Sequence, residues 1–169
     1  MIDKLGSGIS QAIGTGGRDL KAEVGGIMMI EGLKALQNDP FTEVIVLISK
    51  PPDKEVARKV LSILKEGEKP SVVYFAGGDP EVIKEYGSIP GLSLEDTAHK
   101  AVATAKGIPI EDFTGFTVNG TDKIIQRETK KLKETQRYVR GLYTGGTLCD
   151  EAMIILSALI GDIYSNIPL

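Results

Sequence analysis

The stretch VIVLISKPP, residues 44–52, decides the fold. Its first five residues are an unbroken apolar and mostly β-branched run, which is typical of a strand buried on both faces of a parallel sheet. Two prolines then end the strand, and Asp53 follows as the expected N-cap of a helix over residues 54–65. A second run of the same kind, SVVYF at residues 71–75, ends in a Gly-Gly turn. Buried strands that alternate with helices predict an α/β protein.

The alternation extends in both directions from this stretch. Further elements are expected as a strand at residues 9–13, helices at 24–37, 80–86 and 94–106, and a short edge strand at 88–89. Gly25, Gly26 and Gly32 weaken the first of these helices and predict close packing on a sheet. Short connections and right-handed crossovers leave few arrangements. The sequence therefore predicts a flavodoxin-like, three-layer parallel sheet with helices on both faces.

The chain divides into three expected parts. Residues 1–107 form the α/β domain, residues 108–137 an irregular connection with a charged helix at 121–136, and residues 138–169 a further unit. That last unit is expected as a strand at 138–143, a glycine-rich turn and a helix at 148–160. Its tail ends abruptly, so the sequence is expected to be a fragment or a stand-alone module.

Composition excludes several classes of protein. The net charge is −3, with 20 basic against 23 acidic residues, so nothing favours nucleic acid as a partner. The Lys- and Arg-rich residues 123–140 are interrupted by glutamates, as on a solvated helix face. No apolar run approaches the length of a membrane span, and Cys149 is the only cysteine. A soluble cytoplasmic protein without a membrane partner is expected.

Two glycine-rich turns are the main candidates for binding. Parallel strands end at one edge of a sheet, and bare glycines there let backbone N–H groups approach an anion beside a helix N-terminus. A phosphate or a carboxylate is the expected ligand. The alternative is that the glycines only permit tight turns, and Arg18 either clamps the anion or pairs with Asp19. The candidate residues of the two turns are Gly14, Thr15, Gly16, Gly17 and Arg18, and Thr144, Gly145, Gly146 and Thr147.

The sequence shows no catalytic partner near its histidine or its cysteine. His99 lies within the expected helix 94–106, away from the strand ends, and Cys149 has no histidine near it. Both are expected to be structural, and no cluster has the spacing of a metal site. The sequence assigns no catalytic residue and no metal.

Three motifs carry a family resemblance: GTGGRDL at residues 14–20, ISKPP at 48–52 and GLYTGGTL at 141–148. In this order they resemble FdrA-type proteins, homologues of acyl-CoA synthetases. Residues 1–107 resemble the second, ligase domain of the succinyl-CoA synthetase α subunit. The resemblance implies CoA and a nucleotide as cofactors of the family, and other domains or subunits as partners. This chain alone is expected to hold no cofactor.

The chain departs from the family at the phosphohistidine. Synthetases carry a phospho-accepting histidine in a GHAG turn after the strand that matches residues 71–75, and here the chain continues as GDPEVIKEYG. Where they carry the glutamate that holds this histidine, the chain has Lys50, a side chain able to bind a phosphate or a carboxylate. ATP-driven ligation by this chain alone is therefore not expected, and whether it is an enzyme stays open.

A second departure concerns the sheet. The family's domain opens with a strand before the segment that starts here, and that strand lies in the sheet interior. Its loss leaves two unpaired edges. Residues 138–160 are expected to fill the gap, in cis or by exchange between two chains of a homodimer.

Three functions follow from the resemblance. The leading one is a module of an FdrA-type protein that binds a small anionic ligand at the glycine-rich turns. The alternatives are a non-catalytic scaffold or assembly domain, and a piece of an oxamate carbamoyltransferase-type enzyme of purine degradation.

Overall fold

The computed structural model describes residues 1–115 and 120–167. Its sheet has three parallel strands, β1 (Ile45–Ser49), β2 (Ser71–Phe75) and β3 (Ile89–Pro90), in the order β1-β2-β3. Ile45 pairs with Ser71 and Ser49 with Phe75, so β1 and β2 are in register along their whole length. The parallel sheet confirms the predicted α/β class.

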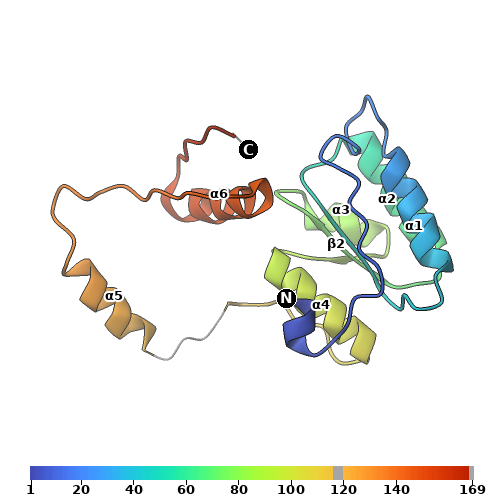
Figure 1. The fold of residues 1–169 in the computed structure, drawn as a ribbon, viewed down its shortest axis with the longest axis horizontal. Coiled ribbons are helices and arrows are strands. Elements are labelled where there is room, and N and C mark those ends of the chain that lie inside the picture. Colours follow the sequence, from blue (N-terminus) through green and yellow to red (C-terminus); the bar gives the residue numbers. More distant parts are fainter. Residues whose placement is uncertain (116–119, 168–169) are drawn as a thin grey trace.

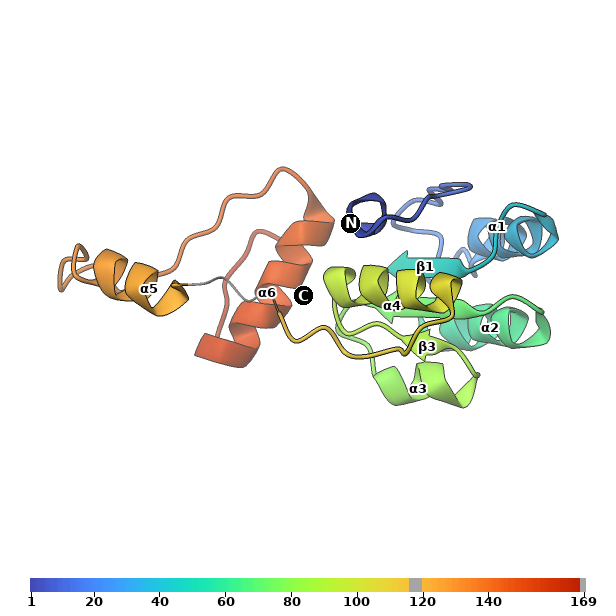
Figure 2. The same ribbon diagram turned by 90° about the horizontal axis from the view of Figure 1, so that it is seen from below.

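Helices cover both faces of this sheet (Figure 2). On one face α1 (Ile27–Asn38), α2 (Lys54–Glu66) and α3 (Pro80–Glu85) bury a core with alternate strand residues such as Leu47 and Val73. On the other face lies α4 (Leu94–Lys106), which contacts β1, β2 and the short 3-10 helix η1 (Ile2–Leu5). Side chains along each strand point alternately to the two faces, and helices cover both faces. For this reason both strands are continuous apolar runs in the sequence.

Several element boundaries agree with the sequence. β2 and α4 span the predicted residues, and the Asp53 carboxylate accepts the N–H groups of Glu55 and Val56 at the start of α2. Ser93 caps α4 by accepting the N–H of Asp96. α1 begins three residues later than predicted because Gly25 and Gly26, at φ of 76° and 77°, are left-handed and not helical.

The strand predicted at residues 9–13 is wrong, since these residues form an extended loop. They form no ladder with β1, which faces them, or with another strand of the described chain, and Ile9 and Ile13 stay exposed. The strand predicted at residues 138–143 is also absent, for the same reason. Part of the expected irregular stretch, residues 116–119, lies outside the described residues.

The C-terminal part of the chain leaves the α/β body (Figure 1). α5 (Thr121–Thr129) stands apart and ends before residue 136, because no described neighbour covers its apolar side chains. α6 (Gly146–Ile160) returns to the end of the sheet. None of the described helices combines the length and the apolarity that crossing a membrane requires.

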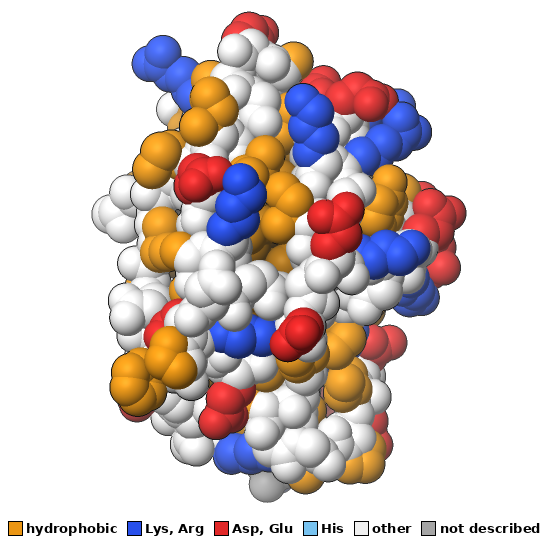
Figure 3. All heavy atoms as spheres, turned by 90° about the vertical axis from the view of Figure 1, so that its right-hand side faces the viewer, with side chains coloured by type: hydrophobic (Ala, Val, Ile, Leu, Met, Phe, Trp, Pro, Cys, Tyr) orange, Lys and Arg blue, Asp and Glu red, His pale blue; other side chains and the backbone are white. Residues whose placement is uncertain are grey.

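The surface over α1 and α2 carries charges of both signs. Figure 3 shows this face, on which Lys and Arg side chains alternate with Asp and Glu. Two of the pairs are Lys34 with Glu31 and Arg58 with Glu55, both exposed. This face therefore offers no large single-sign field for a polyanion.

Gly26 packs on a helix and not on the sheet that the sequence predicted. A Cβ there would lie 2.9 Å from Val56 and 3.3 Å from Leu20, whereas a Cβ on Gly25 would meet nothing within 4 Å. Both residues have a positive φ, so an alanine is strained at either position. Gly26 therefore fixes how closely α1 approaches α2.

We expect Gly25→Ala to lower the free energy of unfolding by about 1 kcal/mol through backbone strain alone. Gly26→Ala adds crowding to the same strain, so it should cost at least about 1 kcal/mol more. Urea unfolding followed by circular dichroism measures both. Equal losses for the two variants would contradict the close contact.

Candidate functional site

Lys50 follows β1 directly and lies at the carboxyl end of the sheet. Its Nζ is 2.7 Å from Oδ2 of Asp150 on α6, and the side chains are 47% and 9% exposed, respectively. Lys50, which the sequence predicted to bind an anion, is thus already paired with the carboxylate of Asp150. An external anion at Lys50 has to compete with Asp150.

The turn of residues 144–147 lies beside this pair. A Cβ on Gly146 would stand 3.4 Å from Lys50 Nζ, so the turn and the lysine meet as neighbours. α6 begins here without a side-chain cap, which leaves its first N–H groups open. The structure therefore brings together Lys50 and the second glycine-rich turn.

Two further contacts hold α6 over the end of the sheet. The Glu151 carboxylate accepts the N–H of Leu94 at 2.6 Å, at the start of α4. Ile154 lies against Gly77, which follows β2. Burial, with Glu151 as the second cause, also raises the pKa of Tyr74 in β2. α6 thus covers the edge where parallel sheets bind ligands.

The turn of residues 14–18 lies at the same end of the sheet. The chain after it is tied to the residue before α2, because Asp53 donates its N–H to the carbonyl of Leu20 at 2.9 Å. A Cβ on Gly14, Gly16 or Gly17 would meet nothing within 4 Å, and Gly16 has φ of 84°. Within the described chain no contact joins this turn to Lys50.

Asp19 has a role that the sequence analysis missed. Its carboxylate is buried and accepts the N–H groups of Met28 at 3.0 Å and Met29 at 2.8 Å, so it caps α1. The alternative in which Arg18 pairs with Asp19 is not formed, since no ion pair joins the two side chains in the described chain. Asp19 lies nine and ten residues before the N–H groups that it binds, outside the spacing of a local N-cap signal, so sequence alone could not find this cap.

A cluster of ion pairs around the buried Lys100 of α4 was also missed. Lys100 Nζ lies 2.8 Å from Asp96, 2.6 Å from Asp112 and 2.9 Å from the carbonyl of Pro90. Burial alone would lower the pKa of Lys100, but its bonds to Asp112 and Asp96 outweigh burial and raise that pKa. The bond from Lys100 is the main reason why the pKa of Asp112 is lowered. Since every member is paired, the cluster holds residue 112 on α4 and is structural.

The reactive side chains lie where the sequence expected them. His99 stacks on Phe113 with ring centroids 4.7 Å apart, on the outside of α4. Cys149 is half-buried in the first turn of α6. Among residues 1–115 and 120–167 no group of three or more His, Cys, Asp or Glu side chains is arranged to hold a metal ion.

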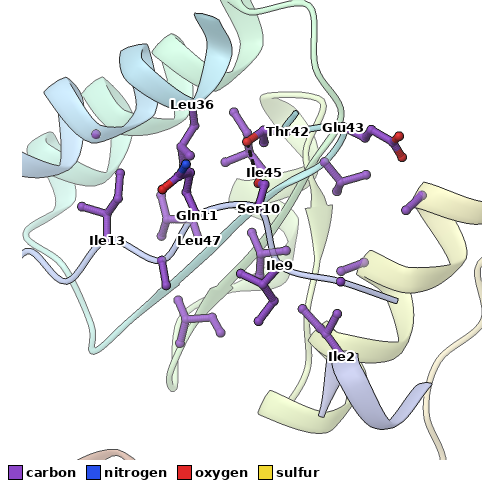
Figure 4. A pocket seen from close by; sticks show the side chains of 18 of the residues that line it. Ile2, Ile9, Ser10, Gln11, Ile13, Leu36, Thr42, Glu43, Ile45 and Leu47 are labelled. Atoms are coloured by element: carbon purple, nitrogen blue, oxygen red, sulfur yellow. Dashed lines mark hydrogen bonds between the residues drawn. The ribbon is translucent and has the colours of Figure 1, made fainter. Parts of the chain in front are cut away.

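A hollow with a volume of about 690 Å³ lies at the free edge of β1. One wall is the facing segment (residues 7–13), and the other is the chain of residues 42–48 (Figure 4). At one end the two walls are joined by the hydroxyl groups of Ser10 and Thr42, 2.8 Å apart. We call this hollow the edge groove.

Comparison with known proteins supports the resemblance at the level of the domain. Residues 1–77 match the family described as "CoA binding domain". This part of the chain, residues 1–77, is therefore similar to CoA-binding domains. The assignment of residues 1–107 to the ligase domain stays a prediction, as does the division of the chain into three parts.

The chain is also similar to the uncharacterized protein YahF of Escherichia coli (strain K12). The two are 43% identical over 166 residues, which is 98% of this chain and 32% of YahF. The chain thus spans about a third of the length of the curated relative that it matches. The relative's name assigns no activity, so the FdrA-type assignment stays a prediction.

We expect Asp150→Asn to loosen α6 from the sheet, because Lys50 then loses its charged partner. Since Lys50 is half exposed, the loss should be about 1 kcal/mol, seen as a roughly fivefold faster amide exchange in the first turns of α6. Hydrogen exchange with mass spectrometry measures it. Glu31→Gln, which breaks an exposed pair, is the control and should change no exchange rate. Unchanged exchange in Asp150→Asn would contradict the docking role.

Proposed function

We propose that the chain is a module of an acyl-CoA synthetase homologue that binds a small anion, a phosphate or a carboxylate, at the turn of residues 14–18. One observation carries the proposal: the glycines of this turn are open to solvent, with no atom where a Cβ would stand. The N–H groups of residues 15–18 have no hydrogen-bond partner within the described chain, and Arg18 is exposed beside them. The turn lies inside the part that matches the CoA binding domain, and CoA itself carries phosphates.

The second turn contributes less to this function. Thr144, Gly145, Gly146 and Thr147 stand at the open N-terminus of α6, which favours an anion. The Asp150 carboxylate beside Lys50 repels one. Binding at this turn therefore requires Lys50 to change partners.

The module has no phosphohistidine chemistry of its own in this proposal. After β2 the chain supplies Asp79, whose carboxylate accepts the N–H of Glu81 and caps α3. His99 is stacked on Phe113 on another face. Any covalent step then depends on residues outside this chain, such as those in the other two thirds of a YahF-like protein.

A scaffold is the second candidate, and one observation favours it. The N–H groups at the start of α1 are taken by Asp19, and the Lys50 ammonium is taken by Asp150. Two groups that could otherwise bind an external anion, the Lys50 ammonium and the N–H groups at the start of α1, are thus satisfied internally. A purely structural domain would show the same pattern.

Thermal unfolding with inorganic phosphate, CoA, carbamoyl phosphate or oxamate separates the two. At tenfold excess over its Kd a ligand adds about 1.4 kcal/mol, which raises the Tm by about 3–5 °C in a protein of this size. We expect such a rise with at least one of the four. Gly17→Ala should abolish it without lowering the unliganded Tm, because the new methyl group touches no protein atom but covers the bare N–H groups.

Gly8→Ala is the matched control. Gly8 also has nothing within 4 Å and no positive φ, but it lies outside the turn, so this variant should keep the ligand-induced rise. No rise with any of the four ligands would contradict the proposal and leave the scaffold. A rise that survives in Gly17→Ala would place the anion elsewhere.

A further inference from the structure

β1 is an edge strand, since it pairs with β2 on one side and with no described strand on the other. Ile45 donates its N–H to the carbonyl of Pro70, and the carbonyl of Ser49 accepts the N–H of Ala76. The backbone N–H and C=O groups of the odd-numbered residues of β1 therefore point at β2. In a parallel ladder the intervening residues point the other way. The N–H and C=O groups of Val44, Val46 and Ile48 therefore face the edge groove. Across the described chain no backbone bond joins them to a partner.

The facing segment and β1 line opposite sides of the edge groove. The facing segment begins near the end of α4, where Lys106 donates to the carbonyl of Leu5, and it ends before Leu20, which is bonded to Asp53 after β1. It thus runs in the same direction as β1 and beside it. Figure 4 shows Ile9 and Ile13 on this segment across from Ile45 and Leu47. A hollow of about 690 Å³ holds at least about twenty waters, which is far more than a packing defect.

The same chain contains an extended segment without a partner. Residues 138–143, which we call the free segment, have no helix or strand structure, and four of the six side chains are exposed and apolar: Tyr138, Val139, Leu142 and Tyr143. Leu142 is fully exposed, at 101%. The free segment is about as long as β1, and its tyrosines and valine favour strands. The free segment therefore matches the edge groove in three ways: its length, its unpaired backbone N–H and C=O groups, and its apolar side chains.

The docking of α6 brings the free segment to the correct end of the groove. Gly146 lies beside Lys50, the residue after β1, and Asp150 fixes it there. A strand that enters the groove parallel to β1 must end next to Lys50, and residues 144–145 are the next in the chain. Residues 114–137 connect the start of the free segment to the body, and at up to about 3.3 Å a residue they can easily span the length of β1.

We infer that the free segment inserts into the edge groove of its own chain as a parallel strand beside β1. The inserted strand pairs with the edge N–H and C=O groups of β1 on one side and with residues 7–13 on the other. Its apolar side chains enter the two core layers. The surface that β1 offers is thus an internal docking site, and its occupant is residues 138–143 in cis.

Disulfide capture tests this insertion. All variants carry Cys149→Ala, so that no other thiol is present, together with Ile48→Cys on the groove wall. Leu142→Cys lies at the end of the free segment that docks near Ile48, and Tyr138→Cys at the far end is its matched control. Two cysteines link only when their Cα atoms come within about 7 Å. We expect the Leu142→Cys variant to form an intramolecular disulfide at least about tenfold faster than the Tyr138→Cys variant.

Three results would overturn the inference. Equal rates for the two positions indicate random collisions of a mobile tail, and no disulfide at either position indicates an empty groove. Disulfide-linked dimers indicate that a second copy supplies the strand. If Ile48→Cys impairs folding, Ile13→Cys on the facing segment replaces it, because that exposed side chain lines the same groove. Peptide mapping and non-reducing electrophoresis distinguish the products.

Discussion

The structure depends on the one unpaired edge of β1. Helices α1 and α2 lie over one face of the strand and α4 over the other, so Ile45 and Leu47 are buried, whereas Ile48 at the open edge stays exposed. Its backbone has a partner only on the side of β2. An open strand edge presents unpaired amide and carbonyl groups to which a further strand can bond. Because no described strand pairs with this edge, residues 7–13 face it as a loop and the edge groove lies between them.

The carboxyl end of the sheet shows the same competition between internal and external partners. α6 lies over it, and Asp150 neutralises the lysine that follows β1. Asp19 in the same way takes the N–H groups at the start of α1. What stays open is the turn of residues 14–18, whose glycines carry bare backbone. In the proposed function the anion binds at that turn, because Lys50 and the N–H groups at the start of α1 already have internal partners.

Local signals in the sequence predicted the α/β class and most element boundaries. Asp53 and Ser93 are caps within three residues of the N–H groups they bind, and SVVYF reads as a buried strand because both faces are covered. The sequence failed where the partner is distant. Residues 9–13 carry strand-forming side chains but lack a neighbouring strand, and Asp19, Asp96 and Asp150 find partners through the tertiary fold. For the site, the glycine turn and Lys50 stay predictions, and the sequence could not foresee that the Asp150 carboxylate faces the lysine.

Amide hydrogen exchange along β1 tests the open edge most directly. The backbone N–H of Leu47 points at β2, whereas the backbone N–H groups of Val46 and Ile48 point into the edge groove. With residues 138–143 seated in the groove, the Val46 and Ile48 amides exchange within about tenfold of the Leu47 amide, because all three are bonded in the sheet. Exchange at Val46 and Ile48 that is about a hundredfold faster or more than at Leu47, measured by NMR on the intact chain, would show an empty groove and contradict the insertion.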